Sequence, residues 1–187
     1  MIHIQERDLQ NDIVTSPEGI RGTFVEHQQE LRWLAGFLTG DDSVGEACVV
    51  DACAFAQRSC TVDADWPAVS PALAVIFSAM QMQRSRIKEL CSVYDGRITQ
   101  SAEGPLSAGA LELIVMESDV LRSRLDSISR FLLAICGFQG CTLTEAAAWL
   151  GISQSAAEAA YSAAVELVDA LDLEKQLACD DGPAMWN

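Results

Sequence analysis

Apolar residues recur at spacings of three and four along most of the chain, which is the spacing that gathers them on one face of an α-helix. In the N-terminal half this pattern predicts a helix from about Thr23 to Leu38, a second from Ser43 to Phe55 and a third from Ser70 to Leu90. The alternation of apolar and polar residues that is typical of strands does not occur. The pattern therefore predicts an all-α protein.

Residues that cap helices stand at the expected helix starts. A serine or threonine followed three residues later by glutamate can bond both exposed backbone amides, and a proline is favoured in the first helical turn. The expected caps are Ser43 with Glu46, Ser70 before Pro71, and Thr142 with Glu145.

Residues 95–109 are rich in Gly, Ser and Pro, which is the composition of a linker. We therefore expect a helical domain over residues 1–94, a linker over 95–109, and a second helical domain with an acidic tail over 110–187. The last helix is expected from about Gln154 to Leu173. Its apolar seam comprises Ala157, Tyr161, Ala164, Val168 and Leu171.

The chain is strongly acidic, with 27 Asp and Glu against 12 Lys and Arg and a formal net charge of -15. A surface of this sign repels phosphate, so it argues mildly against nucleic-acid binding. The N-terminal residues are polar and unlike a signal peptide, and the longest apolar stretch, Pro71 to Met82, is too short to cross a bilayer. We expect a cytoplasmic protein without a membrane segment.

The cysteines and histidines do not form a recognisable catalytic or metal-binding motif. A zinc site requires Cys or His ligands in close pairs, and His3 and His27 are far from Cys136 and Cys141. Neither a phosphate-binding loop nor a nucleophile elbow is present. We expect no enzymatic activity, no cofactor and no metal, and thiols that are mostly buried. The seven cysteines are Cys48, Cys53, Cys60, Cys91, Cys136, Cys141 and Cys179.

A short helix, a glycine-led turn and a second helix are expected over residues 140–173, which is a helix-turn-helix arrangement. The stretch from Gly140 to Ser153 resembles the C-terminal end of bacterial RNA polymerase sigma factors of the extracytoplasmic-function class. That family shows glycine, Leu-Ser, two residues, Glu-Ile-Ala, two residues and Leu-Gly-Ile-Ser. The matching positions here are Gly140, Thr142, Glu145, Ala147, Leu150, Gly151, Ile152 and Ser153.

The N-terminal half is similar to the helices with which this family docks on the polymerase. The resemblance starts at Leu38 and continues through Glu46 and Asp51, which it implies are polymerase-docking residues. It would place an acidic residue at Ala47 and an amide at Val50. The resemblance thus implies two domains, a sigma region 2-like helical bundle and a region 4-like helix-turn-helix domain, with altered polymerase docking.

The expected recognition helix lacks the basic residues that the family uses to bind DNA. Glu158, Ala160 and Ala163 stand where Lys or Arg is usual, and from Phe131 to Glu174 there is no Lys, Arg or His. Because Arg and Lys make many of the backbone contacts in protein–DNA complexes, we expect DNA binding through this domain to be weak or absent. The same three residues are candidates for a protein contact.

One basic cluster remains, at Arg84, Arg86 and Lys88, where the resemblance implies promoter contact. The alternative interpretation is the solvated face of an amphipathic helix, which the neighbouring Glu89 favours.

Three functions stay open on these grounds. The first is a sigma-like transcription regulatory protein that works through protein contacts, with RNA polymerase core or an anti-sigma factor as its partner. The second is a working extracytoplasmic-function sigma factor that directs promoter-specific initiation. The third is an unrelated all-helical enzyme or ligand-binding domain, for which the sequence offers no site residues.

Overall fold

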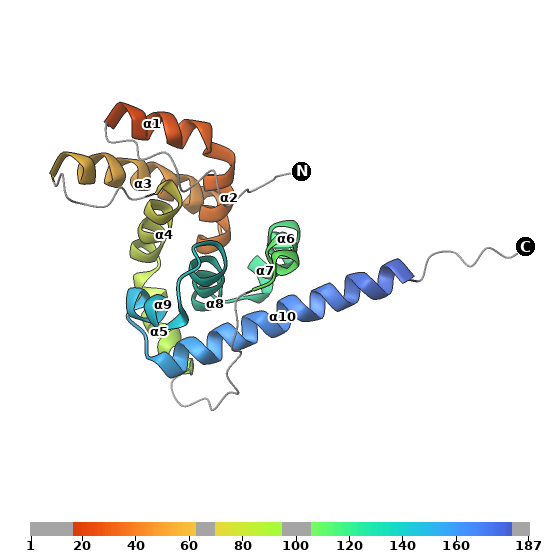
Figure 1. The fold of residues 1–187 in the computed structure, drawn as a ribbon. Helices are drawn as coiled ribbons and strands as arrows, with labels where there is room; N and C mark the ends of the chain where they lie inside the picture. Colours follow the sequence, from red (N-terminus) through yellow and green to blue (C-terminus); the bar gives the residue numbers. More distant parts are fainter. Residues whose placement is uncertain (1–16, 63–69, 95–105, 181–187) are drawn as a thin grey trace, which may run out of the picture. The chain divides into compact units, whose positions relative to one another are not determined.

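The computed structural model describes residues 17–62, 70–94 and 106–180, and within these ranges all regular structure is helical, without a strand (Figure 1). The prediction of an all-α protein is confirmed. The chain divides into two compact units, Met1–Leu90 and Cys91–Asn187.

The first unit is built on two tightly packed helices, α2 and α3, with α1 and α4 against them. The buried side chains include Leu31, Leu34 and Leu38 of α2, as predicted, and Cys48 and Ala52 of α3. The helices of this unit are α1 (Pro17–Glu26), α2 (Gln28–Thr39), α3 (Asp42–Val62), α4 (Pro71–Met82) and α5 (Arg84–Tyr94), of which α5 crosses the division between the units.

Two of the expected helices are each divided in two. The helix predicted to begin at Thr23 instead begins at Pro17 and is interrupted at His27, whose backbone departs from helical geometry. The helix predicted from Ser70 to Leu90 is interrupted at Gln83. The sequence did not predict these breaks, because the apolar spacing continues across each of them. One non-helical residue changes the direction of the chain but leaves the spacing of the apolar residues intact. The cap at Ser70 is confirmed, since its side chain accepts a hydrogen bond from the backbone of Leu73 at 3.2 Å.

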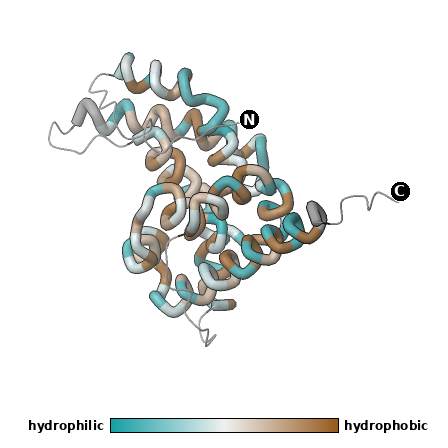
Figure 2. The backbone as a smooth tube through the Cα atoms, turned by 45° about the vertical axis from the view of Figure 1, so that its right-hand side comes forward, coloured by the Kyte–Doolittle hydropathy of each residue, from teal (hydrophilic) through white to brown (hydrophobic). Residues whose placement is uncertain are grey.

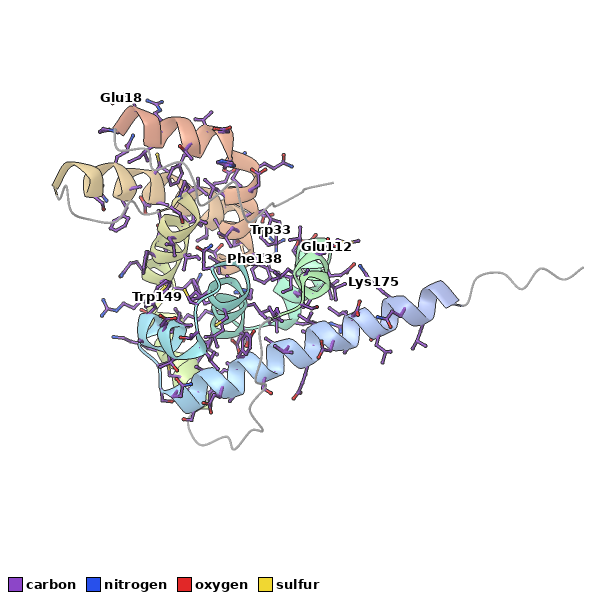
Figure 3. The ribbon with its side chains drawn as sticks, in the orientation of Figure 1. Glu18, Trp33, Glu112, Phe138, Trp149 and Lys175 are labelled. Carbon is purple, nitrogen blue, oxygen red and sulfur yellow. The ribbon has the colours of Figure 1, made fainter. Side chains whose placement is uncertain are left out.

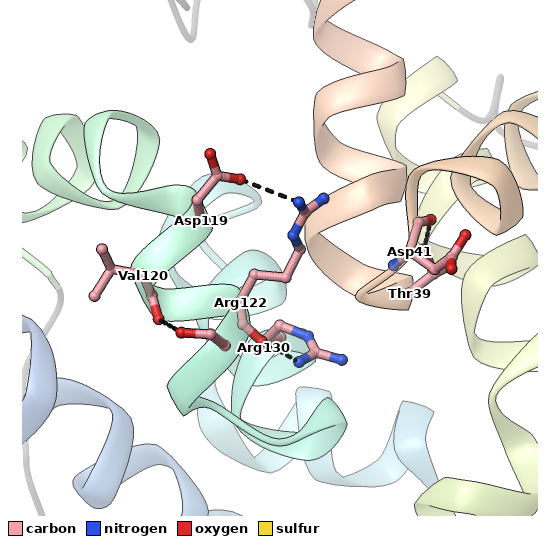
Figure 4. Close-up of polar contacts among 7 residues, drawn as sticks. Thr39, Asp41, Asp119, Val120, Arg122 and Arg130 are labelled. Carbon is pink, nitrogen blue, oxygen red and sulfur yellow. Dashed lines mark hydrogen bonds and ion pairs between the residues drawn. The ribbon is translucent and has the colours of Figure 1, made fainter.

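The turn between α2 and α3 is held by its own polar groups (Figure 4). Gly40 adopts a left-handed conformation, with φ of 78°, and ends α2 by donating to the carbonyl of Gly36. The buried Thr39 hydroxyl donates to the carbonyl of Ala35 at 2.8 Å. Asp41 caps α3, because its carboxylate accepts the amide of Val44 at 3.0 Å. The predicted capping box of Ser43 and Glu46 is therefore wrong, because the helix is capped two residues earlier, at Asp41.

The second unit is organised around α10, which packs against α6, α8 and α9. Its predicted apolar seam from Ala157 to Leu171 is buried, and the helix continues to Asp180, past the expected end. Residues 95–105 of the expected linker lie outside the described ranges, but Ala108 and Gly109 already belong to α6. The elements are α6 (Ala108–Met116), α7 (Ser118–Arg124), α8 (Ser127–Leu132), the π-helical η1 (Leu133–Phe138), α9 (Leu143–Leu150) and α10 (Gln154–Asp180).

A buried arginine holds the turn between α7 and α8 (Figure 4). Arg130 is 5% exposed, and its guanidinium donates to the carbonyls of Leu125 at 2.6 Å and Arg122 at 3.1 Å. Arg122 in turn pairs with Asp119 at 3.1 Å. Arg130 therefore satisfies carbonyls at the end of α7, which would otherwise lose their hydrogen bonds on burial.

Candidate functional site

The segment from α9 through the turn to α10 is capped at each junction. Thr142 and Glu145 form the predicted capping box, and hydrogen bonds from the Thr142 hydroxyl and amide lower the pKa of the Glu145 carboxyl. Gly151 adopts a left-handed conformation, with φ of 66°, between α9 and α10. Ser153 then accepts the amide of Ala156 at 3.1 Å. A short helix, a tight turn and a long helix thus follow one another, as the sequence predicts.

The three candidate positions on α10 do not share one surface. Glu158 is half-buried and accepts a hydrogen bond from Gln154 at 3.1 Å. Ala160 is buried, and its carbonyl accepts the hydroxyl of Ser129 in α8 at 3.2 Å. Ala163 is exposed. Ala160 therefore belongs to the core, so that of the two alanines only Ala163 is available for a contact.

Trp33 and Trp149 are aromatic residues that could stack on nucleic-acid bases, and both are half-buried. Trp33 is half-buried and stacks on Phe37 of the same helix, with ring centroids 5.7 Å apart and an interplanar angle of 8°. Trp149 is half-buried on α9 (Figure 3). Trp66 lies outside the described residues. These placements favour packing over base stacking.

The exposed side of α3 carries apolar residues, and we call it the outer face of α3. Its members are the exposed Ala47, Val50, Asp51 and Phe55 and the half-buried Ala54. Val50 is 70% exposed and Phe55 36%, while Cys48, Ala52 and Ala56 bury the opposite side. The sequence pattern assigned Phe55 to the core together with Cys48 and Ala52. Ala56 completes that row instead, because a spacing of four is kept from Cys48 through Ala52 to Ala56.

The two predicted docking residues differ in their surroundings. The Glu46 carboxylate pairs with the guanidinium of Arg32, so it joins α3 to α2 at the edge of the outer face. Asp51 is exposed within the outer face. The outer face therefore presents one carboxylate, that of Asp51, among apolar side chains. Glu46 also helps to hold α2 and α3 together.

The basic residues of α5 do not form one patch. Arg84, Arg86 and Lys88 are all exposed, on either side of the buried Ile87. At about 100° per residue, Arg84 and Lys88 share one side of the helix and Arg86 points to nearly the opposite side. A flat contact could use the first two or the third, but not all three together.

Burial reduces the acidity of four thiols, because it raises the pKa of Cys48, Cys53, Cys136 and Cys141 above 9.0. Cys48 is fully buried and donates to the carbonyl of Val75 at 3.5 Å; burial raises its pKa from 9.0 to about 11. The pKa of Cys136 is raised to about 11, mainly by burial and to a smaller extent by the nearby Cys141. Such thiols are poor nucleophiles and poor metal ligands at neutral pH. Among the residues with described side chains, no group of three or more His, Cys, Asp or Glu could hold a metal ion.

Comparison of the chain with protein-family models, with curated proteins and with solved structures gives no significant match. Within the described ranges, no helix combines the length and apolar character needed to cross a membrane.

Proposed function

We propose that this protein is a sigma-factor-like transcription regulatory protein that acts through protein contacts, with RNA polymerase core or an anti-sigma factor as its partner. Its C-terminal unit contributes little or nothing to DNA binding. The outer face of α3 is the contact surface.

The observation that carries this proposal is the exposure of Val50. A valine that is 70% exposed in the middle of a 21-residue helix gains little free energy from burial. At about 100° per residue, Val50 and Phe55 lie at the two edges of the outer face, with Ala47, Asp51 and Ala54 between them. Exposed apolar residues next to charge are typical of protein contacts. Of this face, the resemblance implies polymerase docking by Asp51 and places an amide at Val50.

The helix-turn-helix supports the second half of the proposal. DNA-binding helices of this kind present their N-terminal residues to base edges, together with basic residues for phosphates. Here the exposed residues at the start of α10 are Gln154 and Ser155, with Glu158 half-buried behind them. No basic residue occurs from Phe131 to Glu174. Electrostatic attraction to phosphate is therefore missing where this motif needs it.

The test is binding of the full chain to purified bacterial core polymerase, with Val50→Asp and a matched control, Val25→Asp. Val25 is 66% exposed on α1, so both variants should keep the wild-type unfolding free energy to within about 0.5 kcal/mol. We expect V50D to weaken binding by about tenfold or more and V25D to leave it unchanged. Equal effects of the two variants, or no binding by the wild type, would contradict a polymerase contact.

A second experiment separates the two partners. Changing Ala47→Glu and Val50→Asn restores the chemistry that the resemblance implies for polymerase docking, so binding to core polymerase should tighten. An anti-sigma factor that covers the apolar face would instead be lost from native cell extract in this double variant, because a buried carboxylate without a partner is costly. A variant that changes neither binding would remove the outer face of α3 from the proposal.

The exposed Arg84 and Lys88, which share one side of α5, favour the alternative of a working sigma factor. Gel-shift assays on promoter DNA with and without core polymerase distinguish it. A shift that needs core polymerase and disappears in an Arg84→Ala, Lys88→Ala variant would favour promoter-directed initiation over action by protein contacts alone.

A further inference from the structure

The C-terminal part of α10 has two opposite apolar sides. Val168 and Leu171 are 1% and 7% exposed and belong to the core of the second unit. Leu173 and Leu177 are 57% and 60% exposed. At about 100° per residue, these two leucines lie on the side of the helix opposite Val168 and Leu171, with the exposed Ala170 near them. In Figure 1 these last turns of α10 project past the other helices of the second unit.

Contacts on the inner side of α10 anchor its C-terminal part, so the orientation of its outer side is fixed. Lys175 pairs with Glu117, at the end of α6, at 2.8 Å. The buried Leu171 anchors the preceding turn. Gln176 donates to Asp172 at 2.8 Å along the helix. Leu173 and Leu177 are therefore displayed by an anchored helix, so little conformational entropy is lost when a partner binds them.

Acidic residues surround the two exposed leucines. Glu166, Asp169, Asp172 and Glu174 are all exposed. Lys175 is the one basic residue between Gln154 and Leu177, and its ammonium is engaged by Glu117 on the inner side. Hydrophilic and hydrophobic residues alternate along this part of the chain (Figure 2). The outer side thus combines an apolar stripe with negative charge on both flanks.

We propose that the outer side of α10 over residues 166–177 is a docking surface for a basic amphipathic helix of a partner protein. Apolar side chains of the partner would cover Leu173 and Leu177, and its Lys or Arg residues would face Asp169, Asp172 and Glu174. This is the helix-on-helix mode of recognition, with charge setting the choice of partner. The proposal does not depend on the sigma-like function.

The same charges disfavour two other occupants. A second copy of this chain would bring two acidic flanks together, and like charges across an interface are costly. An anionic membrane surface would repel the same carboxylates, and amphipathic helices that bind such surfaces are basic. The surface is also short, about 18 Å for 12 residues, so the contact belongs to the weak, transient class with affinity in the micromolar range.

The probe is a synthetic amphipathic helical peptide of about 18 residues, with a leucine seam flanked by Lys and Arg. A control peptide keeps the seam and replaces the basic residues with Glu. Fluorescence anisotropy with the full chain should show micromolar binding of the basic peptide only. The Leu173→Gln, Leu177→Gln variant should lose about tenfold or more of this affinity, and so should Asp169→Asn, Asp172→Asn.

A matched variant changes two exposed apolar residues elsewhere, Val25→Gln with Met116→Gln, which are 66% and 71% exposed. It should bind the basic peptide as the wild type does. Unchanged binding by the Leu173→Gln, Leu177→Gln variant, or equal binding of the acidic peptide, would overturn the proposal. So would self-association in sedimentation that this double variant abolishes, because a second copy would then be the occupant. Val50→Asp should leave peptide binding intact, which keeps this test separate from that of polymerase contact.

Discussion

Gly45 of α3 lies so close to Gly36 of α2 that a Cβ atom built on Gly45 would come within 2.8 Å of the Gly36 backbone nitrogen. The neighbouring atoms are backbone atoms, which cannot rotate away as a flexible side chain could. Close approach of α2 and α3 thus depends on the absence of a side chain at this crossing. The α2–α3 pair holds Glu46 and Asp51, so this crossing also positions the outer face of α3.

Gly45→Ala should destabilise the protein by about 1–3 kcal/mol, because the added methyl group must push the two helices apart. Gly22→Ala is the matched control, since a Cβ at Gly22 on α1 meets nothing within 4 Å. There the better helix propensity of alanine should stabilise by up to about 1 kcal/mol. Urea denaturation measures both; a neutral or stabilising G45A would show that the crossing is looser than described.

Substitution by arginine at two alanines of α10 should have opposite outcomes. Ala160→Arg places a charged side chain at a fully buried position and should cost several kcal/mol or prevent folding. Ala163→Arg lies at an exposed position and should change the unfolding free energy by no more than about 0.5 kcal/mol. Thermal melting of the two variants side by side decides this. Equal melting temperatures would mean that Ala160 is a surface residue.

Arg130→Ala should destabilise by about 2–4 kcal/mol, because the carbonyls of Leu125 and Arg122 lose their donor while the surroundings stay buried. Arg124→Ala, at an exposed position in the same region, serves as control and should be nearly neutral. Chemical denaturation gives both values. A small effect of R130A would indicate that water replaces the guanidinium.

Stability should fall between about pH 9 and pH 11. Burial raises the pKa of Cys48 from 9.0 to about 11, so in this window the thiol ionises in the unfolded chain but stays protonated in the folded one. A thiol whose pKa is higher in the folded protein than in the unfolded chain stabilises the fold fully at a pH below the unfolded pKa. That contribution is lost as the pH rises through the folded pKa. For Cys48 the loss is on the order of 2 kcal/mol. Urea titrations at several pH values should show a shallower decline for Cys48→Ala; identical declines would exclude this thiol as a source.

The full chain should not bind random duplex DNA detectably at about 0.15 M salt. Its net charge is -15, and from Phe131 to Glu174 it has no Lys, Arg or His that could release counterions from phosphate. Fluorescence anisotropy with labelled duplex measures this. Micromolar binding that weakens steeply with salt would contradict the expectation. If that binding were lost in an Arg84→Ala, Arg86→Ala, Lys88→Ala variant, α5 would be the DNA-contacting element.

Local features of this fold were predictable from the sequence because they depend on residues close together in the chain. The capping box of Thr142 and Glu145, the cap at Ser70 and the seam from Ala157 to Leu171 follow from spacing and from hydrogen bonds over three residues. The helical nature of the chain follows from the same periodicity.

Other features required the tertiary structure because they depend on which side of a helix meets another element. Periodicity identifies an apolar stripe but not its partner, so it could not separate the buried Ala160 from the exposed Ala163, nor the buried Ala56 from the exposed Phe55. The hydrogen bonds of Arg130 could not be predicted from the sequence either, because its partners are backbone carbonyl groups, which every residue has. Sequence therefore determined that this chain is helical and where caps such as Ser70 and Thr142 start helices, whereas packing decided which sides of the helices remain open to a partner.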